Sequence, residues 1–128
     1  MSRILHIDND SSWKSIVADT FQRDTQIEVV TASYPSDILQ ILRGCQYSLV
    51  VMELSLGNDL HQPVGLDIAK VISQELPEVP VLILSGVLTV DRICRAADMK
   101  NIVGVIPKQG VPNSLWLRDR IKQYSACQ

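Results

Sequence analysis

The sequence predicts an α/β fold in which a parallel five-stranded sheet is covered by helices on both faces. Two observations lead to this prediction. Short apolar runs alternate with longer amphipathic segments along the chain. The short runs are continuous in valine, isoleucine and leucine, which is typical of strands buried on both faces. A length of 128 residues suits one compact unit, so we expect a single domain over 1–128.

The first half of the chain predicts three strands and two helices. The strands are expected at 4–7, 27–32 and 49–54, where the apolar runs lie. The first helix should begin at the capping residues Ser11 and Ser12 and run to about Arg23. The second should have Pro35 in its first turn and end at Gly44.

The second half predicts two strands and three helices. Strands are expected at 79–84 and 102–106, and helices at 66–75 and 111–124. The helix between the two strands should turn an apolar stripe to the sheet, made of Val90, Ile93, Cys94 and Ala97. In the last helix the expected apolar stripe is Leu115, Leu117, Ile121 and Tyr124.

Composition excludes several functional classes. The net charge is −2, and lysine and arginine form no dense face, so nucleic acid is not an expected partner. No apolar run approaches the length that spans a bilayer, so no membrane association is expected. The cysteines number three and are widely spaced, which suits reduced thiols. We therefore expect a cytoplasmic protein.

Polar residues follow four of the predicted strands at their carboxyl ends. They are Asp8, Asn9 and Asp10 after the first strand, Glu53 near the end of the third, Ser85 after the fourth and Lys108 after the fifth. In open parallel sheets this edge carries the functional crevice. Clustered carboxylates need a cation, for which Lys108 or Mg²⁺ is expected. The alternative is a solvated acidic rim with one stabilising lysine.

The order of these motifs resembles the receiver domains of two-component response regulators. The resemblance rests on ILHIDND, LVVMEL, a Gly-Leu pair opening the third helix, PVLILSG, and the lysine after the fifth strand. It implies a flavodoxin-like (βα)5 three-layer sandwich with strand order 2-1-3-4-5. It also implies a signal-transduction module that is not an enzyme, with a histidine kinase or another signalling protein as partner.

Two residues depart from what the resemblance implies for the site. Receivers are phosphorylated on an aspartate where this chain has Glu53. Glutamate extends the carboxylate by one methylene, about 1.5 Å. Phosphoryl transfer depends on position, so phosphorylation of Glu53 is not expected. Where acidic residues would hold Mg²⁺, Asn9 stands beside Asp8, so a site at Asp8, Asn9 and Glu53 should bind the ion weakly or not at all. Asp10 is an alternative ligand.

Several readings of this altered site stay open. Glu53 either imitates the phosphorylated state by reaching Lys108 and Ser85, or merely pairs with Lys108. Another reading is a functional receiver that uses Mg²⁺ and is phosphorylated at Glu53 or Asp59. A third is a small flavodoxin-like protein that binds a nucleotide or a flavin, although no GxGxxG or GxxxxGK motif is present.

The resemblance also implies a face for partners, formed by the fourth helix, fifth strand and fifth helix. Its expected residues are Arg92, Arg95, Val105, Trp116 and Arg120. Trp116 beside Arg120 has the composition of an interface hot spot, and the alternative places it at the edge of the core. A homodimer through this face is one expected use.

The loop 57–65 is either a lid or partner-binding element, or a tolerated insertion. His6, inside the first strand, should be buried without a catalytic role.

Overall fold

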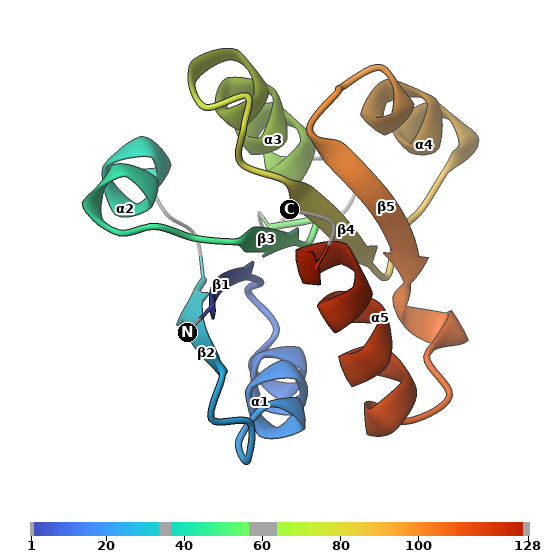
Figure 1. Cartoon of the computed structure of the whole chain (residues 1–128). Helices are drawn as coiled ribbons and strands as arrows, with labels where there is room; N and C mark the ends of the chain where they lie inside the picture. Colours follow the sequence, from blue (N-terminus) through green and yellow to red (C-terminus); the bar gives the residue numbers. More distant parts are fainter. Residues whose placement is uncertain (1, 34–36, 57–63, 127–128) are drawn as a thin grey trace.

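The structure, a computed structural model, describes residues 2–33, 37–56 and 64–126. Its strands form one parallel sheet in the order β2-β1-β3-β4-β5, with helices in alternation (Figure 1). In chain order the elements are β1 (Ser2–Ile7), α1 (Ser11–Thr20), β2 (Ile27–Ala32), α2 (Ile38–Gly44), β3 (Leu49–Met52), α3 (Val64–Glu75), β4 (Val81–Ser85), α4 (Val90–Ala97), β5 (Ile102–Pro107), the 3₁₀ turn η1 (Lys108–Gly110) and α5 (Ser114–Ala126). The predicted fold class and strand order are confirmed.

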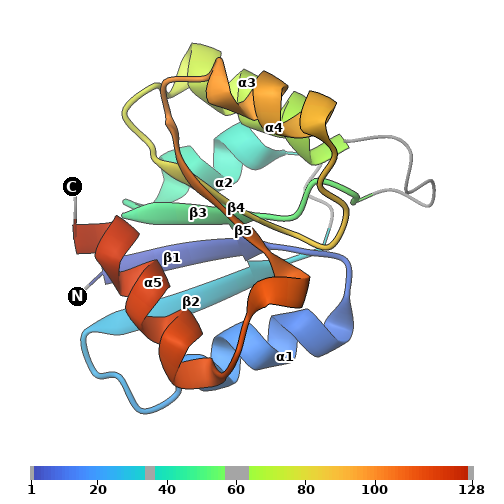
Figure 2. The same ribbon diagram turned by 90° about the vertical axis from the view of Figure 1, so that its right-hand side faces the viewer.

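The sheet separates two apolar layers. Helices α1 and α5 cover one face, and α2, α3 and α4 cover the other (Figures 1 and 2). Adjacent residues of β1 point to opposite faces: Ile4 packs with Val17 and Leu117, whereas Leu5 packs with Leu66. Every residue of β3 and β4 is buried, which explains their continuous apolar sequence. No helix within the described ranges is long and apolar enough to cross a membrane.

Several boundaries differ from those predicted for local reasons. Asp10, not a serine, caps α1: its carboxylate accepts from the backbone N–H groups of Ser12 and Trp13. Strand β3 ends at Met52, before the predicted end at residue 54. Helix α5 begins only at Ser114, where the Asn113 side chain accepts from the Trp116 N–H. Pro35, Asp59, His61 and Cys127 lie outside the described residues, as does the loop 57–63.

The stripe predicted for α4 is wrong. Arg92 and Ala96 are the buried residues of this helix, whereas Val90 is 79% exposed and Ile93 44% exposed. Thr89 caps the helix through the Arg92 N–H, which places Arg92 in the first turn. Its guanidinium reaches acceptors beneath the helix. A charged side chain therefore takes the inward position that the apolar pattern predicted for Val90 and Ile93.

The stripe predicted for α5 is correct except at one position. Leu117 and Ile121 are fully buried, but Leu115 is 69% exposed. Tyr124 lies over Gly104 of β5, where a Cβ atom would stand 2.5 Å from the tyrosine ring. A side chain at position 104 would therefore displace Tyr124 from the sheet.

A close backbone approach joins β3 to the start of α3. The Gly65 N–H donates to the Leu54 carbonyl at 2.8 Å. A Cβ atom on Gly65 would stand 2.1 Å from the Glu53 carbonyl oxygen and 2.7 Å from the Leu54 Cα, closer than real atoms come. Glycine at position 65, the first residue of the Gly-Leu pair, is therefore required by the backbone that carries Glu53.

Candidate functional site at the carboxyl ends of the strands

Three of the predicted rim residues meet: Asp8 and Glu53 both contact Lys108. Lys108, in η1 directly after β5, lies with its Nζ 2.9 Å from Asp8 Oδ2 and 2.9 Å from Glu53 Oε1. The Lys108 side chain is 9% exposed, that of Asp8 0% and that of Glu53 6%. Three strand ends thus place two carboxylates and one ammonium in a nearly dry site, where their attraction is little screened by water.

Both oxygens of the Glu53 carboxylate have hydrogen-bond donors. Oε1 accepts from the Gly86 N–H at 3.2 Å, in addition to its contact with Lys108. Oε2 accepts from the backbone N–H groups of Leu54 at 2.6 Å and Ser55 at 3.3 Å. The side chain therefore folds back onto its own loop and also reaches the β4–α4 loop, which ties β3, β4 and η1 together.

The ion pairs shift the pKa of Asp8 and Lys108 in opposite directions. Burial raises the pKa of Asp8, but contacts with His6, the Asp10 N–H and Lys108 outweigh it, so the pKa lies below its ordinary value. Burial lowers the pKa of Lys108, but Asp8 and Glu53 outweigh it, so that pKa lies above its ordinary value. Both shifts favour the charged forms, carboxylate and ammonium.

An aromatic ring covers the lysine. The Lys108 ammonium lies 5.3 Å from the centre of the Trp13 ring, which projects from α1. Sequence analysis did not single out Trp13 and missed this contact. Spacing along α1 could not have revealed it, because Lys108 lies 95 residues away in η1 and only the folded chain brings it to the Trp13 ring.

The other predicted rim residues have local structural partners. The Asn9 side-chain amide donates to the Leu56 carbonyl at 2.9 Å and so holds the segment after β3. Asp10 caps α1. The Ser85 hydroxyl contacts the backbone of Val87, accepting from its N–H at 3.2 Å and donating to its carbonyl at 3.4 Å. Glu53 was predicted to reach Ser85, but within the described residues it accepts from the neighbouring Gly86 N–H instead.

The described side chains do not fit a magnesium site. Lys108 Nζ lies 2.9 Å from both Asp8 Oδ2 and Glu53 Oε1, so these two carboxylates already have a cation. Asp8 Oδ1 accepts from the Asp10 N–H, and the Asn9 amide nitrogen is turned to Leu56. Within the described part of the chain, no group of three or more histidine, cysteine, aspartate or glutamate side chains is arranged to hold a metal.

Arg92 is not a surface residue, contrary to the prediction. It is 5% exposed, and its Nη1 lies 2.9 Å from Ser55 Oγ and 3.0 Å from the Val87 carbonyl oxygen. It therefore joins the segment after β3 to the β4–α4 loop. Sequence analysis could not place it there, because Ser55 lies 37 residues away and the Val87 carbonyl is brought into reach only by the fold of the β4–α4 loop.

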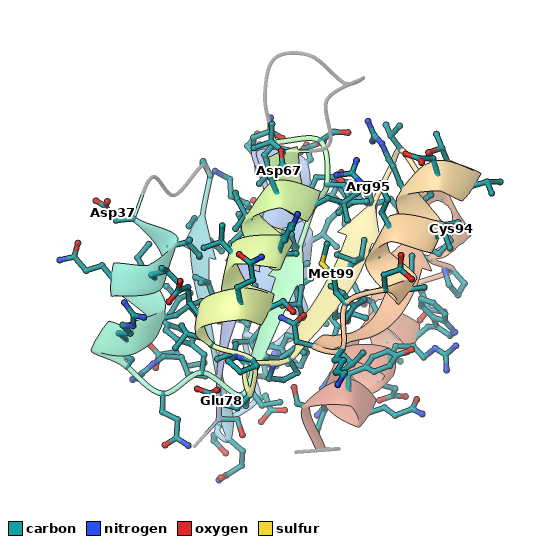
Figure 3. All side chains as sticks on the ribbon, turned by 90° about the horizontal axis from the view of Figure 1, so that it is seen from above. Asp37, Asp67, Glu78, Cys94, Arg95 and Met99 are labelled. Carbon is teal, nitrogen blue, oxygen red and sulfur yellow. The ribbon has the colours of Figure 1, made fainter. Side chains whose placement is uncertain are left out.

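The remaining residues of the predicted partner face divide between two sides of the molecule. Arg95 is exposed but lies on the side of α4 that faces α3, 3.8 Å from Asp67 (Figure 3). Val105 is partly buried under the α2, α3 and α4 layer. Trp116 packs partly buried against the other layer, with the guanidinium of Arg120 5.4 Å from its ring centre. Trp116 thus lies at the edge of the core and still presents an arginine-covered face.

The first strand adds a buried histidine behind the site. His6 is fully buried, as predicted, and its Nε2 lies 3.5 Å from Asp8 Oδ2. This distance exceeds that of an ordinary hydrogen bond, and neither ring nitrogen of His6 has a hydrogen-bond partner within the described residues. His6 therefore lies behind Asp8 in the sheet without a hydrogen bond to it.

Known proteins share this architecture. The family model of the response regulator receiver domain matches residues 4–118. A CheY-like response regulator receiver domain protein from Methanospirillum hungatei JF-1 superposes with a TM-score of 0.83 at 17% identity, covering 98% of this chain and 94% of that one. For a response regulator from Thermotoga maritima the values are 0.79 and 20%, with 98% of each chain covered.

A third solved structure is similar in the same way. Chemotaxis protein CheY4 from Vibrio cholerae gives a TM-score of 0.76 at 18% identity, covering 97% of this chain and 98% of that one. The comparison with curated protein sequences found no match. At these identities, the solved structures establish a shared fold.

Proposed function

Because this chain belongs to the response regulator receiver domain family, we propose that it is a signalling module that acts by binding a protein partner and is not switched by phosphorylation. Receiver domains are in general non-enzymatic and interact with kinases and other signalling proteins. The proposal concerns how this member departs from a phosphorylated switch. The observation that carries it is the state of the Glu53 carboxylate.

Glu53 is poorly prepared to act as a nucleophile. A nucleophilic oxygen needs a lone pair free to approach phosphorus in line with the leaving group. Here Oε1 is held by Lys108 and the Gly86 N–H, and Oε2 by the N–H groups of Leu54 and Ser55. Attack by either oxygen would require breaking these bonds in a site where the side chain is 6% exposed.

The same contacts favour partial imitation of a phosphorylated site over a merely degenerate one. The resemblance to receivers implies that the conserved lysine contacts phosphoryl oxygens, and Lys108 contacts the longer carboxylate of Glu53 directly. Glu53 also reaches the loop after β4 through Gly86. A carboxylate carries one charge, whereas a phosphoryl group carries nearly two, so the imitation is partial but permanent.

The surface best suited to a partner lies on α4, β5 and α5, which line one side of the molecule (Figure 2). Large apolar side chains are exposed on all three elements: Val90 and Ile93 on α4, Val103 on β5 and Leu115 on α5. Arg120 and Trp116 add a stacked cation and ring on α5. These residues replace Arg92, Arg95 and Val105 as the proposed partner face.

The test is intact mass after incubation with Mg²⁺ and acetyl phosphate. Wild type, Glu53→Asp and, as a matched control on an exposed strand residue, Glu28→Asp are compared. We expect no phosphoryl adduct on wild type or on the control. An adduct on wild type would overturn the proposal. An adduct on Glu53→Asp alone would assign the block to Glu53, and none on any variant would extend it to Asp8 and Asn9.

A further inference from the structure

Arg92 connects segments that are distant in the sequence. Its guanidinium donates to Ser55 Oγ at 2.9 Å and to the Val87 carbonyl at 3.0 Å. Its backbone N–H donates to Thr89 Oγ1, the cap of α4, at 3.2 Å. One buried residue therefore holds the segment after β3, the β4–α4 loop and the first turn of α4 at the same time.

Two of the three segments that Arg92 holds also contact Glu53. The Ser55 N–H donates to Glu53 Oε2, while its hydroxyl accepts from Arg92. The Gly86 N–H donates to Glu53 Oε1, one residue before the Val87 carbonyl that Arg92 binds. A continuous path of hydrogen bonds thus leads from the carboxylate through Ser55 to Arg92 and helix α4.

The hydroxyl of Ser85 does not supply this path in the described part of the chain. Its two hydrogen bonds there both run to the backbone of Val87, two residues away. It closes a local turn of its own loop. The side chain that bridges to α4 is Arg92.

We propose that Arg92 is a positioning residue that couples the Glu53 carboxylate to the first turn of α4. The inference rests on the proposed function, since it treats Glu53 as a permanent, unmodified anion. The physical reason is the burial of the guanidinium. A buried arginine must keep its acceptors, because leaving its N–H groups unpaired is costly. Ser55, Val87 and the first turn of α4 are therefore expected to move together or not at all.

The experiment is a double-substitution cycle read by NMR hydrogen exchange. The reporter is the Ile93 amide, which donates to the Thr89 carbonyl at 3.0 Å and so reports whether the first turn is closed. The proteins are wild type, Glu53→Gln, Arg92→Met and the double variant. Methionine keeps an apolar stem and removes the guanidinium donors. Arg95→Met, alone and with Glu53→Gln, is the matched control from an exposed position on α4.

In wild type and in Arg95→Met, we expect Glu53→Gln to speed exchange of the Ile93 amide about tenfold, because the loss of one charge-assisted contact opens the turn. In Arg92→Met, we expect Glu53→Gln to change it by less than about twofold. The Gly86 amide, which contacts Glu53 directly, should respond in every background. If Arg92 merely stabilised the fold, Glu53→Gln would change Ile93 exchange by the same factor with and without Arg92.

Two results would overturn the inference. One is an Ile93 response to Glu53→Gln that persists in Arg92→Met, which would route the effect through Gly86 alone. The other is no Ile93 response in wild type, which would make α4 independent of the pocket. If Arg92→Met does not fold, Ser55→Ala removes one of the two acceptors and should reduce the Ile93 response, and an undiminished response would overturn the inference. A phosphoryl adduct on wild type would overturn only the proposed function, so the two failures are distinguishable.

Discussion

At the carboxyl end of the sheet, Lys108 lies 2.9 Å from each of two carboxylates with 9% of its side chain exposed. At the amino end, Arg3 lies 3.0 Å from Glu28, but these side chains are 35% and 46% exposed. The distances are nearly equal, whereas the surroundings are not. Water screens the Arg3–Glu28 pair and competes for its hydrogen bonds. The two sets of ion pairs should therefore contribute very different amounts to the free energy of unfolding.

The amino end is open to solvent over a wide area. A surface cavity of about 780 Å³ lies there, lined in part by Arg3, Glu28, Arg43 and Tyr47. Arg43 pairs with Glu75 at 3.8 Å, with both side chains 55% exposed. These ion pairs are on the surface, whereas the carboxyl end encloses its charges beneath Trp13 and the loops that follow β3 and β4. Burial, more than distance, therefore determines how much each ion pair contributes to stability.

The largest effect is expected from Lys108→Met. Removing the ammonium leaves the buried carboxylates of Asp8 and Glu53 without their cation, which should lower the free energy of unfolding by about 3–5 kcal/mol. Urea denaturation followed by circular dichroism measures it, with Arg3→Met as the matched control. A loss below about 1 kcal/mol would show that the two ends are energetically alike.

The backbone contact at Gly65 sharpens the comparison without changing any charge. In Gly65→Ala, the new Cβ would clash with the Glu53 carbonyl and force β3 and α3 apart, at an expected cost of about 2–3 kcal/mol. Gly44→Ala is the control, since no atom lies within 4 Å of a Cβ at that position. Thermal denaturation of both variants measures the difference. Equal melting temperatures would contradict the close approach.

The pH dependence of the free energy of unfolding should show a smaller effect of the ion pairs at the carboxyl end. Because the pKa of folded Asp8 is lowered, its contribution is complete above its unfolded pKa of about 3.9 and is lost as the pH falls through the lower, folded value. Because the pKa of folded Lys108 is raised, its contribution is complete below about 10.4 and is lost as the pH rises through the higher, folded value.

Urea denaturation across the pH range tests these signs. Between the two limits, stability should change little through Asp8 and Lys108. In Asp8→Asn, the loss of stability in acid should be shallower than in wild type. A wild type that gained stability in acid would contradict the direction of the Asp8 shift.

The smallest effect is expected from Arg3→Met itself. Loss of the exposed pair with Glu28 should change the free energy of unfolding by less than about 1 kcal/mol, and high salt should remove most of the change. Urea denaturation at low and high salt measures it. A large, salt-independent loss would mean that the amino end holds its charges as firmly as the carboxyl end.

The fold was predictable from the sequence because the buried strands are easily recognised by their apolar residues. Residues 49–52 and 81–84 are continuous apolar runs, and burial on both faces requires such a sequence. The meeting of Asp8, Glu53 and Lys108 followed from topology alone, since the carboxyl ends of parallel strands share one edge. Topology does not depend on where individual side chains point.

The failures came from contacts between distant segments. Apolar periodicity placed Ile93 inward, but the inward position went to Arg92, whose acceptors on Ser55 and Val87 are known only once the chain has folded. Arg95 was exposed as expected but faces α3, because Asp67 lies across from it. A helix of eight residues has too few apolar positions for periodicity to determine its orientation.

The stacking of Trp13 on Lys108 has an optical consequence. The chain has two tryptophans, and each ring has a cation near it: Lys108 near Trp13 and Arg120 near Trp116. Indole emission responds to nearby charge, and only the Trp13 ring lies beside the buried lysine. In a Trp116→Phe variant, the remaining tryptophan fluorescence would therefore report on the charge state of Lys108, with no added label.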